Sequence, residues 1–245
     1  MVIQTNGIVL KQIKTGNDRR IIVLFSQKLG KVSVASTTTY HTKSKSSAIL
    51  QPFNYGKYML YQSKDIYNMN QGEVIKSFYK IGEDIDKYAC SSYILEFTDK
   101  ILAEHQPDNK IFNLLLDFLN VIESRKKDYL MIVRAYEIKA LSYNGIMPQF
   151  LECIRCGDKN TKDFSIVEGS LLCESCRDNN TLILSLDHII IEVMKYIEQH
   201  SIKELEKLSL DKMVLKKLNT FMQLYLKHHM EINNMKSVNF LNTCL

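Results

Sequence analysis

Long apolar runs, prolines and glycines are all scarce in this sequence. The longest apolar stretches, such as 21–25 and 130–133, fall far short of the roughly 18 residues that a membrane-spanning helix needs. Only three prolines and nine glycines occur in 245 residues, which argues against extended linkers. The first residues show no charged region, apolar run and small-residue cleavage site in that order. We therefore expect a cytoplasmic globular protein and favour two domains over one large domain.

Motifs of the common catalytic classes are also missing. The chain has no glycine-rich phosphate loop of the GxxxxGK[ST] kind, no Ser-His-Asp grouping with a supporting motif and no clustered carboxylates for a two-metal site. His228 and His229 are adjacent, so on a helix they point about 100° apart and cannot chelate a metal as an i, i+4 pair would. We expect a protein that is not an enzyme, although the scattered acidic ligands of a nuclease would leave no such motif.

Two Cys-x-x-Cys pairs carry the most specific chemical signal. Sixteen residues separate the pairs, and four thiolates from two tight knuckles complete a tetrahedron around one zinc ion. Because all four positions are filled, such a site holds structure and leaves no position for a reacting water. The predicted ligands are Cys153, Cys156, Cys173 and Cys176. Between the pairs, apolar residues at 164, 166 and 171–172 flank Glu168-Gly169-Ser170 and predict a small hairpin.

Two other chemistries use similar cysteine patterns. A zinc-dependent nucleobase deaminase needs a His-x-Glu element ahead of a Pro-Cys-x-x-Cys, but here Leu151 and Glu152 precede the first pair and no such element comes before it. A pair of disulfides needs an oxidising compartment, for which the sequence carries no export signal. Structural zinc is the favoured interpretation.

The positive charge is concentrated in the first third of the chain. Residues 1–80 contain twelve Lys or Arg against three Asp or Glu, a balance of +9, whereas the whole chain carries +5. A compact basic module attracts polyanions, nucleic acid above all. A membrane surface or an acidic protein would respond to the same field.

The same residues follow β patterning. Segments rich in β-branched residues alternate with turns, Val32 and Val34 alternate with polar neighbours, and Gly72 marks a kink in the last segment. Five short strands suit a small closed barrel, and the oligonucleotide-binding (OB) barrel is the natural candidate because it takes single strands across its face. The expected strands span 3–13, 19–25, 31–34, 53–61 and 65–78. One face of the fourth strand carries Tyr55, Lys57, Met59 and Tyr61.

The segment 36–47, between the third and fourth strands, has eight Ser or Thr among its twelve residues. Its hydroxyl and ammonium groups could meet phosphate oxygens, and Tyr40 could stack on a base, a contact worth roughly 1 to 3 kcal/mol. A polar connection kept in solution by its charges explains the composition equally well. The strand arginines could likewise face water. The candidate nucleic-acid contacts are Arg19, Arg20, Lys28, Lys31, Tyr40, Lys43, Lys45 and Lys57.

From residue 81 the hydrophobic period becomes helical. The expected helices span 81–102, 111–122, 128–141, 186–199 and 209 to about 230, with Asp108, Asp128, Ser185 and Ser209 as the residues that begin the last four. Ser201 and Glu204 predict a capping box. The predicted architecture is therefore α+β, with an OB-fold barrel over 1–80 and a helical bundle over 81–245. A zinc element inserted at about 150–180 ties two of the helices together, in a region poor in apolar side chains.

Several short motifs follow one another in order along nearly the whole chain. They are Gly7-Ile8-Val9-Leu10, Asp18-Arg19 before 21–25, Gly30-Lys31, Leu50-Gln51-Pro52-Phe53, Gly145-Ile146-Met147-Pro148, the two Cys-x-x-Cys pairs, Lys236-Ser237 and Phe240-Leu241. Each is short, but their order and spacing together resemble the RecO family of bacterial recombination mediators.

The resemblance implies an OB-fold barrel followed by a helical, zinc-bearing domain that is not an enzyme. Members of the family bind single- and double-stranded DNA, anneal complementary strands without ATP, and work with the RecR protein and single-strand-binding protein to load RecA. This implies a place in the bacterial cytoplasm, at the nucleoid. The family commonly carries arginines in the loop that here spans 37–43, where this chain has a thinner charge. The acidic, apolar-ended tail of single-strand-binding protein needs a basic rim beside an apolar groove, for which Lys216, Lys217 and Lys227 are candidates.

Two other functions stay open from the residues alone. In a protein-interaction scaffold the zinc bundle is the binding surface and the charge of the barrel is incidental. In a metal-dependent nuclease, scattered carboxylates cleave DNA in the presence of magnesium. DNA binding by the barrel and cleavage assays distinguish the three.

Overall fold

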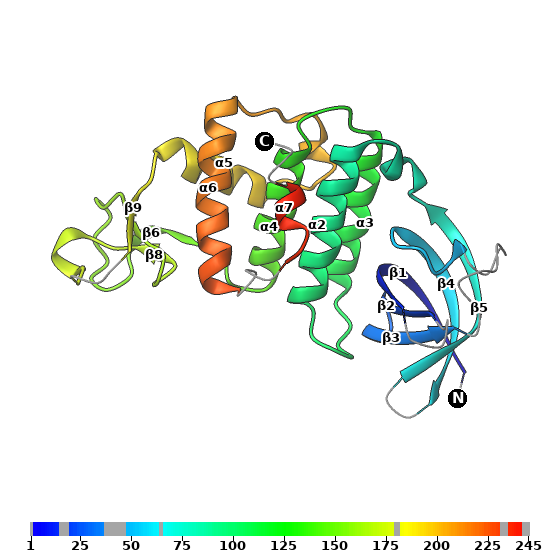
Figure 1. The fold of residues 1–245 in the computed structure, drawn as a ribbon. Coiled ribbons are helices and arrows are strands. Elements are labelled where there is room, and N and C mark those ends of the chain that lie inside the picture. The colour runs from blue at the N-terminus through cyan, green and yellow to red at the C-terminus, as the bar shows by residue number, and fades with distance from the viewer. Residues whose placement is uncertain are drawn as a thin grey trace. The chain divides into compact units, whose positions relative to one another are not determined.

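The structure is a computed structural model that describes residues 2–14, 20–36, 48–63, 66–178, 182–230 and 235–241. The chain forms two compact units (Figure 1). The first comprises Met1–Arg125 and Met235–Cys244, and the second comprises Lys126–Asn234. Among the described helices, none combines the length and the apolar character that crossing a membrane requires.

Five strands of the first unit close into a barrel. Their order is β1-β2-β3-β5-β4, and every neighbouring pair is antiparallel except β3 and β5, which run parallel. This is the OB fold that the strand pattern predicts. The strands are β1 (Val2–Lys14), β2 (Arg20–Ser26), β3 (Gly30–Ser36), β4 (Asn54–Ser63) and β5 (Ile66–Ser77).

Side chains alternate between the inside and the outside of the barrel, as the pleat of a strand requires. In β4, Tyr58 and Leu60 are buried, whereas Lys57 and Tyr61 are exposed. The four residues predicted to share one face of this strand therefore do so, and that face points out of the barrel, with Tyr55 and Met59 half-buried. Burial raises the pKa of Tyr58, whose hydroxyl donates a hydrogen bond to the carbonyl of Ile49 at 3.0 Å. The core comprises Val9, Ile22, Leu24, Val32, Val34, Ile49, Leu50, Tyr58, Leu60, Tyr67 and Met69.

Two glycines of the barrel make room for Ile49. A Cβ on Gly72 would lie 2.9 Å from Cγ1 of Ile49, and a Cβ on Gly56 would lie 2.3 Å from Cδ1 of the same residue and 2.6 Å from the carbonyl oxygen of Glu73. The irregularity predicted at Gly72 lies instead on either side of it, because Gly72 pairs regularly with Tyr58 and the two register shifts of β5 fall at 69–71 and 74–76. These glycines serve close packing of the core.

Two helices of the first unit, α2 (Ile85–Ile101) and α3 (Asn109–Ser124), lie side by side next to the barrel (Figure 1). The predicted cap of α3 is confirmed, because the carboxylate of Asp108 accepts a hydrogen bond from the backbone N–H of Ile111 at 2.9 Å. A 3-10 turn, η1 (Tyr79–Glu83), precedes α2, and the short helix α7 (Val238–Leu241) also belongs to this unit. The compact unit thus extends beyond the strands, to Arg125.

The second unit contains three longer helices and a small sheet. The helices are α4 (Tyr129–Tyr143), α5 (His188–Gln199) and α6 (Lys212–His229), with the 3-10 turn η3 (Glu204–Lys207) between the last two. The sheet has the order β6-β8-β7-β9. Its strands are β6 (Gln149–Cys153), β7 (Asp163–Ser165), β8 (Ser170–Leu171) and β9 (Ile183–Ser185). The antiparallel pair β7 and β8 confirms the predicted hairpin.

The N-caps of the second unit differ partly from the predicted ones. The capping box is confirmed, since Glu204 accepts from the backbone N–H of Ser201 at 2.6 Å and its own N–H donates to the Ser201 hydroxyl at 3.2 Å. Ser185 and Ser209 are not the caps of α5 and α6, which follow Asp187 and Asp211. The sequence offers a serine and an aspartate two residues apart at both places, and both residue types cap helices well.

Helix α4 is buried on every face from Tyr129 to Leu141. Its two most buried charges pair with each other, with Nη1 of Arg134 lying 2.5 Å from Oε2 of Glu137. Lys139 donates from Nζ to the carbonyl of Glu198 in α5 at 2.8 Å, and burial lowers its pKa. A helix with so little exposed surface is a central element of its unit.

The close packing at Gly56 predicts a loss of stability in the Gly56→Ala variant. We expect its free energy of unfolding to fall by about 1 to 3 kcal/mol, because the new methyl group overlaps both a core side chain and a backbone carbonyl. Urea unfolding followed by circular dichroism measures the loss. Gly82→Ala is the matched control, since nothing lies within 4 Å of a Cβ at that position. Equal stability of the two variants would contradict the packing argument.

Candidate metal centre and nucleic-acid interface

The first cysteine knuckle begins at the end of β6. The backbone N–H of Gly157 donates to the carbonyl of Cys153 at 2.8 Å, and Gly157 adopts a positive φ of 77°, a conformation that glycine reaches without strain. The N–H of Ile154 donates to the carbonyl of Leu171 at 3.0 Å. The knuckle is thereby fixed to β8, close to the second cysteine pair.

The second knuckle is the 3-10 turn η2 (Glu174–Cys176) together with the cysteine before it. All four cysteine sulfurs lie within 4.8 Å of one another, and Sγ of Cys156 is 3.6 Å from Sγ of Cys173. Four sulfurs at the zinc–sulfur distance of about 2.3 Å would stand about 3.8 Å apart at the corners of a tetrahedron. The predicted ligands therefore converge, and their arrangement fits one metal ion.

The thiols of this cluster have strongly perturbed pKa values. The hydrogen bond from the backbone N–H of Cys173 is the largest cause of lowering the pKa of Cys153, to about 6. Hydrogen bonds with Cys173 and Cys156 raise the pKa of Cys176 to about 12. Thiolates this close together repel one another, so some of the four thiols keep their protons. A divalent cation displaces those protons and compensates the negative charge of the thiolates. Metal affinity should accordingly fall as the pH falls.

The segment 149–185 carries the four cysteines and is called the metal element below. It packs on an aromatic cluster. Phe164 of the hairpin lies 5.4 Å from Phe150 and 5.2 Å from Phe221 of α6, measured between ring centroids. The hydroxyl of Tyr225 donates to the carbonyl of Ile146 at 2.9 Å. The prediction that this region is poor in apolar side chains is therefore wrong. The cluster draws on three segments far apart in the sequence, so no local pattern reveals it.

One histidine of α6 also contacts the metal element. Nε2 of His229 lies 2.7 Å from the carbonyl oxygen of Ile166, in the hairpin turn, and its ring is tilted against that of Tyr225, with 4.3 Å between the centroids. Both His228 and His229 are exposed. The second histidine therefore helps to dock the hairpin on α6.

The candidate nucleic-acid contacts fall into three groups. Lys28 and Lys57 are exposed on the barrel, and within the described part of the chain their ammonium groups have no hydrogen bond or ion pair. Arg20 is buried in β2, and Lys31 is buried in β3. The others, Arg19, Tyr40, Lys43 and Lys45, lie outside the described residues.

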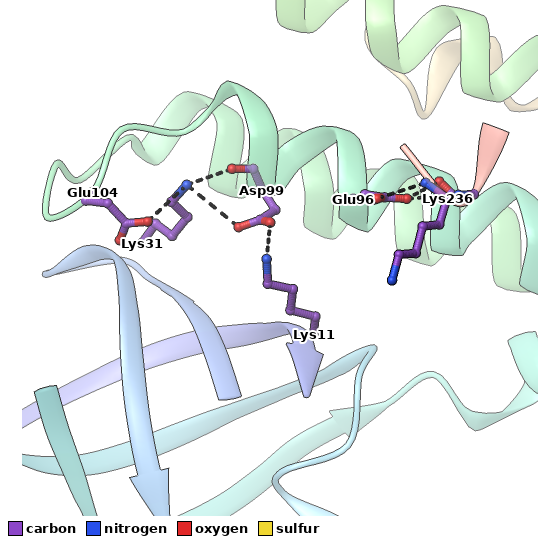
Figure 2. A network of polar contacts seen from close by, with 7 residues as sticks. Lys11, Lys31, Glu96, Asp99, Glu104 and Lys236 are labelled. Carbon is purple, nitrogen blue, oxygen red and sulfur yellow. Dashed lines mark hydrogen bonds and ion pairs between the residues drawn. The ribbon is translucent and has the colours of Figure 1, made fainter. Parts of the chain in front are cut away.

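Lys31 belongs to a polar network between the barrel and the end of α2 (Figure 2). Its Nζ donates to the carbonyl of Asp99 at 2.7 Å and lies 3.2 Å from Oε1 of Glu104. Lys11 of β1 pairs with the same aspartate, with Nζ 2.6 Å from Oδ2. Sequence reasoning missed Asp99, because nothing in the helical pattern distinguishes it from a solvated charge.

A second carboxylate of α2 holds the C-terminal helix in place (Figure 2). Glu96 accepts from the backbone N–H of Lys236 at 3.1 Å, and from the N–H and hydroxyl of Ser237 at 2.9 and 2.6 Å. Burial acts to raise the pKa of Glu96, but these hydrogen bonds outweigh it and lower the pKa. The Lys236-Ser237 motif is thus the partner of an acidic residue in α2.

An open groove of about 510 Å³ lies between the start of α5 and the face of α6. Ile190, Phe221 and Leu224 give it an apolar floor, and Lys216 and Lys217 lie at it as well. Lys217 is paired with Asp187. Among the residues that the structure describes, the ammonium group of Lys216 has no ion pair, whereas that of Lys217 does, and Lys227 does not line the groove.

Comparisons with known proteins agree along the whole chain. A family model described as recombination protein O N terminal matches residues 1–78, and one described as recombination protein O C terminal matches residues 82–238. The DNA repair protein RecO of Acetivibrio thermocellus is 30% identical over 98% of this chain and 96% of its own length. That of Alkaliphilus metalliredigens is 29% identical over 97% and 98%, and that of Bacillus pumilus is 28% identical over 97% and 96%.

An OB-fold barrel followed by helices and by a cluster of four cysteines that could hold a metal ion defines the class of protein. The two family models fall on these two parts of the chain. The chain belongs to the RecO family of DNA repair proteins.

Replacing a cysteine should empty the metal site and loosen the element around it. We expect Cys173→Ser to lose the one bound metal ion, because three thiolates and a hydroxyl bind zinc-like ions far more weakly than four thiolates. Metal content by mass spectrometry and limited proteolysis within 150–178 measure the two effects. Cys90→Ala, which removes a cysteine of α2 outside the cluster, should leave the metal content unchanged. Retention of the ion by Cys173→Ser would contradict the assignment of this ligand.

Proposed function

We propose that this protein is a recombination mediator of the bacterial cytoplasm, at the nucleoid. It binds single- and double-stranded DNA, anneals complementary strands without ATP, and helps to load RecA onto strands coated by single-strand-binding protein. RecR is its partner in loading. The observation that carries the proposal is the match of RecO models and relatives to both parts of the chain. The role is not enzymatic, because it consists of bringing strands and proteins together.

The barrel is the proposed DNA-binding element. The predicted phosphate contacts that are free to move are Lys28 and Lys57, since their ammonium groups are exposed and have no partner among the described residues. Lys31 would have to leave Asp99 and Glu104 to meet a phosphate. Charge and stacking do not read sequence, so we expect little base preference.

The proposed metal is one structural zinc ion. Four thiolates are the ligand set of structural zinc, and the sulfur positions fit its tetrahedron. When bound, zinc supplies cross-links between the two knuckles. The chain's own aromatic residues then fix the element against α6.

The groove beside α6 is the proposed receptor for the tail of single-strand-binding protein. The tail is acidic and ends in apolar side chains, and the groove offers an apolar floor with a positive charge from Lys216. Lys217 is already neutralised by Asp187. Lys216 is therefore the proposed basic residue at the rim of the groove, and Lys227 is no longer a candidate.

Salt dependence tests the proposed DNA contacts. If the protein neutralises five phosphates, the log of single-strand affinity should fall with the log of salt concentration at a slope near −3.5, or about −0.7 per phosphate. The double variant Lys28→Ala/Lys57→Ala should bind single strands less tightly, and the magnitude of its salt slope should be smaller by about 1.4. Fluorescence anisotropy of a labelled oligonucleotide measures both. Lys76→Ala is the control, because Glu123 and Asn120 already engage that ammonium. A salt slope of zero for the unmodified protein would contradict the proposed phosphate contacts.

Strand annealing on bare and coated DNA separates the barrel from the groove. Without ATP, we expect the protein to anneal both substrates, and Lys216→Glu to anneal bare strands normally but coated strands at least about tenfold more slowly, because a reversed charge in the groove repels an acidic tail. Lys227→Glu, on the same helix but outside the groove, is the control. Equal rates for both variants on coated strands would remove the tail from this groove. A parallel incubation with magnesium exposes any nuclease.

One observation favours a different function, that of a protein-interaction scaffold. Two of the eight candidate DNA contacts, Arg20 and Lys31, are buried, so part of the positive charge of the barrel serves its own fold. In a scaffold the second unit binds proteins and the barrel binds no DNA. Suppose that the full-length protein binds the tail of single-strand-binding protein but no oligonucleotide. That result would favour the scaffold function.

A further inference from the structure

Arg155 stands between the two cysteines of the first knuckle, and its guanidinium reaches across to the second. Its Nη1 donates to the carbonyl of Cys176 at 2.7 Å. Its Nη2 donates to Oε1 of Glu168 at 2.8 Å and to Oδ2 of Asp178 at 3.1 Å. One side chain therefore joins the first knuckle, the hairpin turn and the end of the second knuckle.

This geometry differs from an ordinary surface ion pair. An exposed pair contributes at most about 1 kcal/mol and has no consequence for a neighbouring site. Here one bond goes to the backbone carbonyl of a metal ligand, and the two carboxylates hold the planar fork in the direction of that carbonyl. The rigid fork of an arginine can serve three acceptors at once, which the single ammonium of a lysine cannot do in the same directions.

The charge of the metal centre does not by itself single out Arg155. Four thiolates and one divalent cation leave the centre with an excess of two negative charges. Within the described residues, two arginines lie beside the cysteines. Arg177 pairs with Asp163 at 3.3 Å and Glu174 at 3.7 Å, whereas Arg155 donates to the carbonyl of a cysteine.

We propose that Arg155 is a positioning residue of the metal centre, which holds the second knuckle in register with the first and thereby slows the release of the metal ion. The proposal rests on the assignment of zinc to the four cysteines. In this role Arg155 does not touch the metal. It fixes the backbone that carries Cys176, in the way that outer-shell partners fix the ligands of other metal sites.

The rate of zinc release tests the role of Arg155. Full-length zinc-loaded protein is mixed with an excess of a chromogenic chelator, and the absorbance of the zinc complex is followed with time. We expect Arg155→Lys to release zinc about 10- to 100-fold faster than the unmodified protein, the usual cost of losing an outer-shell partner. Arg177→Lys, the matched control, should stay within about threefold.

Cobalt substitution provides a readout that simple unfolding would not mimic. The absorption of Co²⁺ bound to Arg155→Lys should keep the bands of four thiolates, since the ligands are unchanged, while the ion leaves faster. If Arg155→Lys does not fold, Glu168→Gln decides, because it keeps the arginine but removes the carboxylate that orients it. We expect this variant to release zinc several-fold faster.

Three results would overturn the proposal, and they are distinguishable. Release from Arg155→Lys, or from Glu168→Gln if that variant decides, at the rate of the unmodified protein removes the role of Arg155 and leaves the zinc site intact. Equal acceleration in Arg177→Lys shows that losing either guanidinium fork beside the cysteines has this effect, because both substitutions keep the positive charge, and it removes the particular role of Arg155. Unmodified protein that contains no zinc removes the metal assignment itself, and the role of Arg155 with it.

Discussion

The pairing of buried Lys31 with Asp99 is the interaction on which the first unit depends. Both side chains are only about a tenth exposed, at 11% and 12%, and a charge with so little water needs a partner. Strand β5 pairs with only two residues of β3, at its far end. The near end of β3 is instead covered by the loop after α2, where the N–H of His105 donates to the carbonyl of Lys31. The barrel and helices α2 and α3 therefore belong to one compact unit.

In the second unit, the cysteine cluster and aromatic packing both stabilise a small sheet. Strands of two to five residues are too short to be stable by themselves. Phe164 packs against Phe221 of α6, and the four cysteines bring together the knuckles that follow β6 and β8. These two sets of contacts supply stability that the short strands lack. The metal element is therefore more than a clip between two helices.

The sequence predicted the parts of the molecule whose chemistry is local. Alternating β-branched residues located the five strands, and the spacing of the cysteines located their cluster, since each signal lies within a few residues. Partners distant in sequence could not be predicted. Lys31 meets an aspartate 68 residues later, and periodicity places a strand residue inside or outside without naming its partner. Where serine and aspartate stood two residues apart, as at Ser209 and Asp211, propensity could not choose between them.

Helix α7 has a consequence for the order in which the protein matures. The chain leaves the first unit at Arg125 and returns to it at Met235, where Glu96 receives the backbone of Lys236 and Ser237. The second unit is thus inserted within the first. During synthesis from the N-terminus, the barrel and its two helices emerge early, but their last packing partner emerges only after the entire second unit. Completion of the DNA-repair fold therefore waits for the part of the chain that carries the cysteines.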